Sequence, residues 1–245
     1  MLFVSFAALL INTSLASVEC SDKTDYDETY LVYPFELQAL PYSEDFLSPF
    51  VSEDIVMAHY EHHHQAYVDK LNAFIETSSY YENMTLAELS QVAITDESEP
   101  LQKFAGGAYN HYLYWSILTN PDCTKEEPEG PLAFKILESW DTVEDFITEF
   151  NSTLGTVFGS GWVWACVNSN EDIEIRKTAN QLNPLMDYEN ICYPFLGADA
   201  WEHAYYLDYK WAKQSYYNAF FGAIDWDVVE EFYESYSSDL EAIPF

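Results

Sequence analysis

The stretch DAWEHAYY, at residues 199–206, places a carboxylate and an imidazole four residues apart within a run of aromatic side chains. Asp199 and His203 would face the same side of a helix, and they remain neighbours if Asp199 lies just before the helix begins. Imidazoles together with one carboxylate form a ligand set that suits iron or manganese. This stretch therefore predicts part of a metal site, whose other ligands must come from elsewhere in the chain.

The histidines supply candidates for those ligands because they are clustered. All 6 fall in three short segments, at residues 59–64, 110–111 and 202–203. His59 and His63 lie four residues apart, so they share one face of a helix. Three imidazoles from these segments, together with Asp199, would make a mononuclear site with one position open for solvent or substrate.

Other site patterns fit this chain poorly. Residues 61–64 contain one Glu-x-x-His, but di-iron bundles need two such motifs plus further inward glutamates, and no second copy lies on a comparable helix. The zinc-protease motif His-Glu-x-x-His, the phosphate-binding P-loop and the nucleophile motif Gly-x-Ser-x-Gly do not occur. We interpret His62 and His64 as ordinary surface or core histidines.

The hydrophobic pattern predicts helices first and a small antiparallel sheet with helices afterwards, which is an α+β order. Thr85 begins one of these helices with Glu88 three residues later, which is the pattern of a capping box. The other helices of the first half are expected at residues 53–77 and 101–118. In the second half we expect two short helices within 132–150, strands at 162–167, 172–177 and 195–199, and helices from residue 201 onward.

The charge balance is strongly acidic. The chain carries 42 acidic residues against 9 basic ones, a formal net charge of -33. Such a surface repels nucleic acid and anionic membranes, so we expect neither as a partner. The simplest interpretation is a solvated acidic coat that favours solubility.

The first residues resemble a secretory signal peptide. Residues 2–11 are almost continuously apolar and small residues follow at 14–17, although no Lys or Arg precedes the apolar run. This run is too short to span a bilayer, so we expect a secreted, extracellular protein. Asn83 and Asn151 each begin an Asn-x-Ser/Thr pattern, which makes both candidate N-glycosylation sites.

The cysteines leave their pairing open. In a secreted chain, four cysteines can form two disulfides with three possible pairings, and the positions here are Cys20, Cys123, Cys166 and Cys192. Cys166 follows an apolar aromatic strand, so a buried free thiol is an equal alternative there.

Residues 199–206 closely resemble the signature of the iron/manganese superoxide dismutase family, which usually has Val at position 200. The resemblance continues in order through residues 40–42, 59–67, 110–115, 159–164, 180–185 and 225–226. It implies an enzyme that converts superoxide to dioxygen and hydrogen peroxide by alternately reducing and oxidising one bound metal ion.

The implied fold is an N-terminal long-helix hairpin packed on a C-terminal α/β domain with a small antiparallel sheet. We assign residues 36–122 to the hairpin domain and residues 123–235 to the C-terminal domain. The remaining segments are a signal peptide at 1–17, an acidic N-terminal arm at 18–35 and a tail at 236–245.

The resemblance also implies a role for each matching residue. The four protein ligands of one metal ion per chain would be His59, His111, Asp199 and His203. His63 and Tyr67 would gate the substrate channel and relay protons, and Gln181 would hydrogen-bond solvent on the metal. An aromatic wall would be formed by Trp115, Trp162 and Trp201.

Two implied roles cross between subunits. Glu202 would reach His203 of the partner subunit, and Tyr206 would bond to His63 of the partner subunit. These roles predict a homodimer or a tetramer.

The position of one glutamine favours manganese over iron. Iron-type members usually carry it four residues before the second histidine ligand, where this chain has Gly107. Manganese-type members carry it in an Asn-Gln segment before the third ligand, and Asn180-Gln181 fits that pattern. We therefore expect manganese, with iron as the alternative.

Three positions near the implied channel mouth depart from the family's pattern. His62 replaces a usual Lys, Lys213 a usual Arg, and Trp211 a usual Asn. Because superoxide is an anion, the net charge of -33 should slow its approach, so we expect an encounter rate that rises as salt is added. Stopped-flow rates that fall steeply with salt would instead indicate a locally positive funnel.

A rival hypothesis is a secreted acidic protein that keeps the same fold for non-catalytic metal or calcium binding in a structural role. The net charge favours this rival, whereas the complete ligand set with His63, Tyr67 and Gln181 argues against it. Calcium titration by calorimetry separates the two, because tight stoichiometric uptake would favour the rival.

Overall fold

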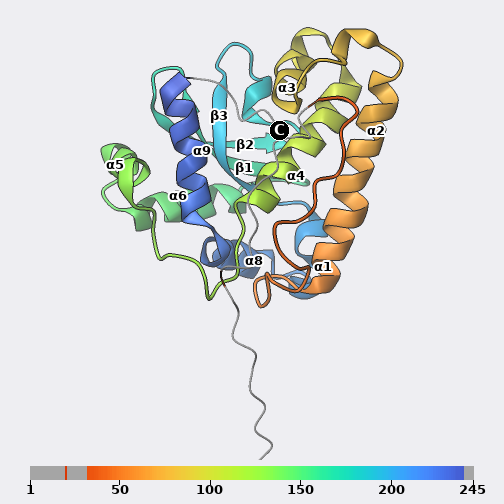
Figure 1. Ribbon diagram of the computed structural model, residues 1–245. Coiled ribbons are helices and arrows are strands. Elements are labelled where there is room, and N and C mark those ends of the chain that lie inside the picture. Colours follow the sequence, from red (N-terminus) through yellow and green to blue (C-terminus); the bar gives the residue numbers. More distant parts are fainter. Residues whose placement is uncertain (1–19, 21–31, 240–245) are drawn as a thin grey trace, which may run out of the picture.

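The computed structural model describes Cys20 and residues 32–239 (Figure 1). The expected signal peptide at 1–17, most of the acidic arm at 18–35 and the end of the tail at 236–245 lie outside the described residues. Within the described part of the chain, no helix is both long enough and apolar enough to cross a membrane.

One long helical rod opens the first half of the fold. It consists of α1 (Glu53–Met57), a π-helical segment (Ala58–His64) and α2 (Gln65–Ile75), which follow one another without a break. Its α2 part buries Val68, Leu71 and Ile75, which recur at helical spacing. The helix predicted at 53–77 is confirmed, but its middle is wider than an α-helix because its hydrogen bonds run from i to i+5.

The helix α3 (Leu86–Thr95) follows a short 3₁₀ turn (Ser79–Tyr81) and begins at the predicted capping box. The Thr85 hydroxyl accepts a hydrogen bond from the Glu88 backbone N–H at 3.2 Å. The Glu88 carboxylate accepts one from the Thr85 N–H at 2.8 Å. Both bonds satisfy N–H groups that have no partner inside the helix.

Replacing Thr85 with Ala should lower the free energy of unfolding by about 1 kcal/mol, because the Glu88 N–H loses its capping partner. Thr95→Ala is the matched control, since the Thr95 hydroxyl donates to the Val92 carbonyl at the other end of α3 and caps no N–H. Urea unfolding of both variants checks this prediction. Equal midpoints for the two variants would contradict it.

A second helical stretch completes the hairpin. A π-helical turn (Leu101–Ala105) leads into α4 (Gly106–Ser116), which lies beside α2 and packs against both α2 and α3 (Figure 1). Every residue of α4 is buried. The helix expected at 101–118 is therefore confirmed, and it forms the centre of the hairpin.

The sheet has the strand order β2–β1–β3, and both pairings are antiparallel. Its strands are β1 (Gly161–Asn168), β2 (Ile173–Ala179) and β3 (Cys192–Asp199). The register pairs Trp162 of β1 with Asp199 of β3. The predicted strands are confirmed, although β3 begins at Cys192 rather than at residue 195. A 3₁₀ turn (Pro184–Met186) lies in the irregular segment between β2 and β3.

Helices lie before and after the strands in the second half of the chain. They are α5 (Gly130–Ser139), α6 (Val143–Gly155), α7 (Tyr206–Tyr209), α8 (Lys213–Phe220) and α9 (Trp226–Asp239), with a 3₁₀ turn (Phe221–Ala223) after α8. The helix α6 packs against β1 and β2, and α9 packs against β3 (Figure 1). The two helices expected within 132–150 are confirmed, with α6 continuing to Gly155.

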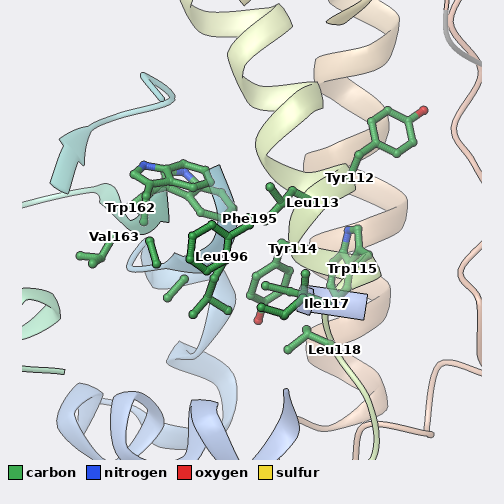
Figure 2. Close-up of a cluster of buried hydrophobic side chains, with 14 of the residues drawn as sticks. Tyr112, Leu113, Tyr114, Trp115, Ile117, Leu118, Trp162, Val163, Phe195 and Leu196 are labelled. Carbon is green, nitrogen blue, oxygen red and sulfur yellow. The ribbon is translucent and has the colours of Figure 1, made fainter. Parts of the chain in front are cut away.

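The hairpin and the sheet share one apolar core. Figure 2 shows Leu113 and Tyr114 of α4 near Trp162, Phe195 and Leu196 of the sheet, and all five are buried. Fully burying side chains of this kind contributes roughly 1.5–3 kcal/mol each. This core therefore fixes α4 relative to β1 and β3, the elements that carry much of the site described below.

The cysteines form two disulfides, Cys20–Cys123 and Cys166–Cys192. The alternative of a free thiol at Cys166 is therefore wrong. Cys166 and Cys192 are fully buried and join β1 to β3. Cys123 lies between α4 and α5, so the other disulfide ties Cys20 to the segment that connects the two halves of the fold.

Candidate metal centre

The four predicted ligands converge from four different elements. His59 comes from the π-helical segment, His111 from α4, Asp199 from the end of β3, and His203 from a 3₁₀ turn (Glu202–Ala204). One ligand atom from each residue lies within 4.8 Å of those from the others. Three of the residues are fully buried, and the His203 side chain is 8% exposed.

The spacing of these atoms matches one coordination shell. Asp199 Oδ2 lies 2.9 Å from Nε2 of His203, 3.2 Å from Nε2 of His59 and 3.9 Å from Nε2 of His111. Two donors bound to one ion at about 2.1 Å lie about 3.0 Å apart at a right angle and about 3.6 Å apart at 120°. The Asp199 distances therefore suit one shared ion, and the most widely separated ligand atoms, up to 4.8 Å apart, must draw together by about half an ångström to bind it.

The strand end orients the carboxylate of Asp199. The Trp201 N–H donates to Asp199 Oδ1 at 2.8 Å, so Oδ2 is left to face the imidazoles. Asp199 ends a strand and His203 lies in a 3₁₀ turn. The two residues are thus neighbours through a strand-to-turn corner rather than through an α-helical face.

A backbone carbonyl fixes the tautomer of His111. Its Nδ1 lies 2.6 Å from the Gly107 carbonyl oxygen, four residues earlier on α4. Because a carbonyl can only accept, Nδ1 donates and Nε2 keeps its lone pair toward Asp199.

The wide π-helical turn positions the histidines of the first segment. His59 is fully buried, whereas His63 is exposed in the single chain. Both rings nevertheless contact His203, with centroid separations of 4.5 Å for His59 and 4.2 Å for His63. The prediction that His59 and His63 share one face is therefore confirmed.

The buried imidazoles carry nitrogens that the protein alone does not satisfy. Within the described residues, His111 Nε2 and both ring nitrogens of His59 lack a hydrogen-bond partner. Burial is the largest cause that holds the pKa of both histidines well below its usual value, so both rings are neutral. A buried nitrogen without a partner costs roughly 1–3 kcal/mol, whereas a metal ion uses the same lone pair. The residues present therefore fit an iron or manganese ion.

Gln181 lies beside the cluster and is bonded to Tyr67. Its Nε2 donates to the Tyr67 hydroxyl at 3.0 Å. Its Oε1 accepts from Trp162 Nε1 and from Asn110 Nδ2, each at 3.1 Å. These two donors fix which end of the amide faces Tyr67. The Tyr67 ring in turn lies 5.3 Å from the His111 ring, between centroids.

Gly107 leaves the space that the Tyr67 ring occupies. A Cβ at position 107 would lie 2.5 Å from ring carbons of Tyr67, so Gly107→Ala must displace the ring and should cost roughly 1–3 kcal/mol of stability. Gly222→Ala is the matched control, because nothing lies within 4 Å of a Cβ there. Thermal unfolding and a crystal structure of each variant check this. A Gly107→Ala structure with an unmoved Tyr67 ring would contradict the prediction.

The three predicted tryptophans each pack against a ligand ring. The centroid separations are 4.7 Å for Trp115 and His59, 5.3 Å for Trp162 and His111, and 5.4 Å for Trp201 and His203. Trp115 and Trp162 are buried, and Trp201 is half-buried. This arrangement shields the ligand atoms from bulk water.

Two further predicted residues lie at the surface. Glu202 and Tyr206 are exposed in the single chain and do not belong to the ligand cluster. Their exposure leaves both side chains available to a partner subunit.

Sequence reasoning missed two residues that support the site. His64 is fully buried, and its ring stacks against that of His111 at 5.4 Å between centroids. Asn183 Nδ2 donates to Asn110 Oδ1 at 3.0 Å, which orients the amide that holds Gln181. In a π-helical turn, residues five apart lie on one face. The spacing of His59 and His64 would therefore have indicated a place for His64 at the site only if such a turn had been expected. No pattern in the sequence marks Asn183.

Comparison with protein families agrees with this geometry. The model of the alpha-hairpin domain of iron/manganese superoxide dismutases matches residues 34–119. The model of the C-terminal domain of the same enzymes matches residues 128–232. The first match contains His59 and His111, and the second contains Asp199 and His203. This chain therefore belongs to the iron/manganese superoxide dismutase family.

Proposed function

We propose that this chain is a superoxide dismutase that works with one manganese ion, held by His59, His111, Asp199 and His203. The observation that carries the proposal is the buried cluster of three imidazoles and one carboxylate beside the Gln181–Tyr67 pair. The net reaction converts two superoxide ions and two protons to dioxygen and hydrogen peroxide. A bound manganese ion would take an electron from one superoxide ion and give one to the next.

The side chains beside the cluster hold and move the protons. The Tyr67 oxygen accepts from Gln181 and keeps its own proton for donation. Burial, partly offset by that hydrogen bond, raises the pKa of Tyr67 to about 12, so its hydroxyl is protonated at neutral pH. His63 is exposed and stacks on His203, which places it to exchange protons with bulk water.

Two positions favour manganese over iron. Gln181 is fixed by Trp162 and Asn110 where the glutamine of a manganese-type enzyme would act. At Gly107, the corresponding iron-type position, the Tyr67 ring fills the space where a side chain would begin. The chain thus offers one such glutamine, on the manganese-type segment.

Metal content by mass spectrometry, with a dismutase assay on the same natively produced sample, tests the proposal. We expect about one manganese per chain together with activity. Iron with activity would overturn the choice of metal and keep the function. Little redox metal, no activity and tight stoichiometric calcium uptake would replace the proposal with the non-catalytic binding protein.

The same proposal includes secretion and a homodimer or tetramer. Two disulfides suit an oxidising compartment, and the exposed Glu202 and Tyr206 are available to a partner. Of the two candidate glycosylation sites, Asn83 is exposed in a turn, whereas Asn151 is half-buried within α6. Mass spectrometry of the secreted protein and its molar mass in solution test these points.

A further inference from the structure

A cavity of about 420 Å³ leads to the Gln181–Tyr67 pair. Tyr67, Gln181 and Trp201 line it on the side of the metal centre. Glu99 and Lys103 also line it, and both are exposed. Glu99 lies just before the π-helical turn that leads into α4, and Lys103 lies within that turn. This cavity therefore joins solvent to the residues that are proposed to donate protons.

Lys103 is the one cationic side chain among the residues that line this cavity. Within the described part of the chain, no carboxylate oxygen lies within 4.0 Å of its ammonium group. Ion pairs to carboxylates neutralise Lys125, Lys135 and Arg176. Within the described residues the other lysines have no carboxylate partner, as Lys103 has none, so Lys103 is distinguished by its place on the cavity. The Lys103 ammonium lies 5.7 Å from the Phe104 ring centroid, and its charge remains available to an incoming anion.

We propose that Lys103 is the residue that attracts the anionic substrate into this cavity, and that Glu99 opposes it. The inference rests on the proposed function. A chain with a net charge of -33 repels superoxide at long range, but charges beyond about 8 Å are largely screened at physiological salt. Local charges at the entrance therefore decide the final approach, and here they are one Lys and one Glu.

Stopped-flow dismutation rates across a range of salt concentrations test this inference. Removing one charge about 7 Å from the path of a unit anion in water changes the encounter rate roughly two- to threefold. At low salt, Lys103→Gln should lower kcat/KM by this factor and Glu99→Gln should raise it by a similar factor. Both differences should shrink as salt is added. Lys125→Gln is the matched control, because it removes the same charge from a surface site outside this cavity.

The pair of variants separates steering from structural damage. A perturbed fold would lower the rate in both, whereas steering moves the two rates in opposite directions. Equal rates and equal salt dependence for wild type, Lys103→Gln and Lys125→Gln would overturn the inference while leaving the dismutase intact. A wild type that binds metal without dismutase activity would instead overturn the proposed function.

A second readout is independent of turnover. Trp201 lines the cavity, and Trp140 and Trp211 are the other two tryptophans that are not buried. In a protein that carries Trp140→Phe and Trp211→Phe, Trp201 is therefore the one tryptophan that a dissolved quencher can reach. Iodide, an anion, should quench its fluorescence less after Lys103→Gln, whereas neutral acrylamide should quench it equally in both proteins. An unchanged iodide quenching constant would contradict the role of Lys103 even if the protein lacked activity.

Discussion

Asp199→Asn should remove stoichiometric metal and lower dismutase activity at least about 100-fold. Even the loss of a side chain that only supports a metal ligand lowers metal affinity or activity by roughly 10- to 100-fold. Asp199 is the one carboxylate in the cluster, and its Oδ2 lies between 2.9 and 3.9 Å from all three imidazole nitrogens. The amide of Asn has nearly the same shape but carries no negative charge. Three neutral imidazoles and a neutral amide leave the charge of a divalent or trivalent ion uncompensated in a buried site.

The same substitution should leave the fold intact. The Trp201 N–H can still donate to the side-chain oxygen at position 199, and no buried charge is left without a partner. Asp141→Asn is the matched control, because Asp141 is exposed in the loop between α5 and α6. Metal analysis, activity and circular dichroism on both variants check this. An Asp199→Asn protein with the full metal content of wild type and more than about a tenth of its activity would contradict the assignment of the ligand.

Replacing Cys166 and Cys192 together with Ala should lower the free energy of unfolding by about 3–4 kcal/mol. The disulfide joins residues 26 positions apart, and breaking it restores the conformational freedom of that loop in the unfolded chain. Because the bond connects β1 to β3, it also supports the strand that ends at Asp199. Activity at 25 °C should persist, since no ligand is changed.

Reductant provides the control for this double variant. Both cysteines are fully buried, so a reductant should reach the bond only when the protein unfolds. Reductant also breaks the Cys20–Cys123 bond, so the two proteins are compared under the same conditions. Unfolded in urea with reductant, wild type and the double variant should have about equal stability, and without reductant wild type should stay above the double variant. A stability difference below about 1 kcal/mol without reductant would contradict the prediction.

Short motifs located the residues of the site. The Thr85 capping box follows from side chains three residues apart, whereas the four ligands and Gln181 were implied by the resemblance to a known family. The structure confirms the capping box, brings the four ligands into one cluster and places Gln181 against Tyr67. The helix at 53–77 was found from apolar spacing, but its π-helical middle was not. Periodicity records which residues face the core and does not distinguish a turn closed by i to i+4 bonds from one closed by i to i+5 bonds.

Features that depend on long-range packing could not be predicted. The pairing of Cys166 with Cys192 follows from the register of β1 and β3, which the sequence did not determine. The same holds for Asn183, which reaches the site only because the segment after β2 passes Asn110. Lys103 was one basic residue among 9 until the fold placed it on the cavity beside Tyr67.

The π-helical segment sets the rotation between the turn that carries His59 and the core-facing part of α2. In an α-helix, each residue added or removed rotates everything beyond it by about 100°. Here the wide turn lies between α1 and the residues Val68, Leu71 and Ile75, which must face the core. Because the rod is continuous, the wide turn fixes one rotation between His59 and the core-facing residues of α2. Deleting one residue from this segment would therefore turn His59 away from the other ligands or turn α2 away from the core.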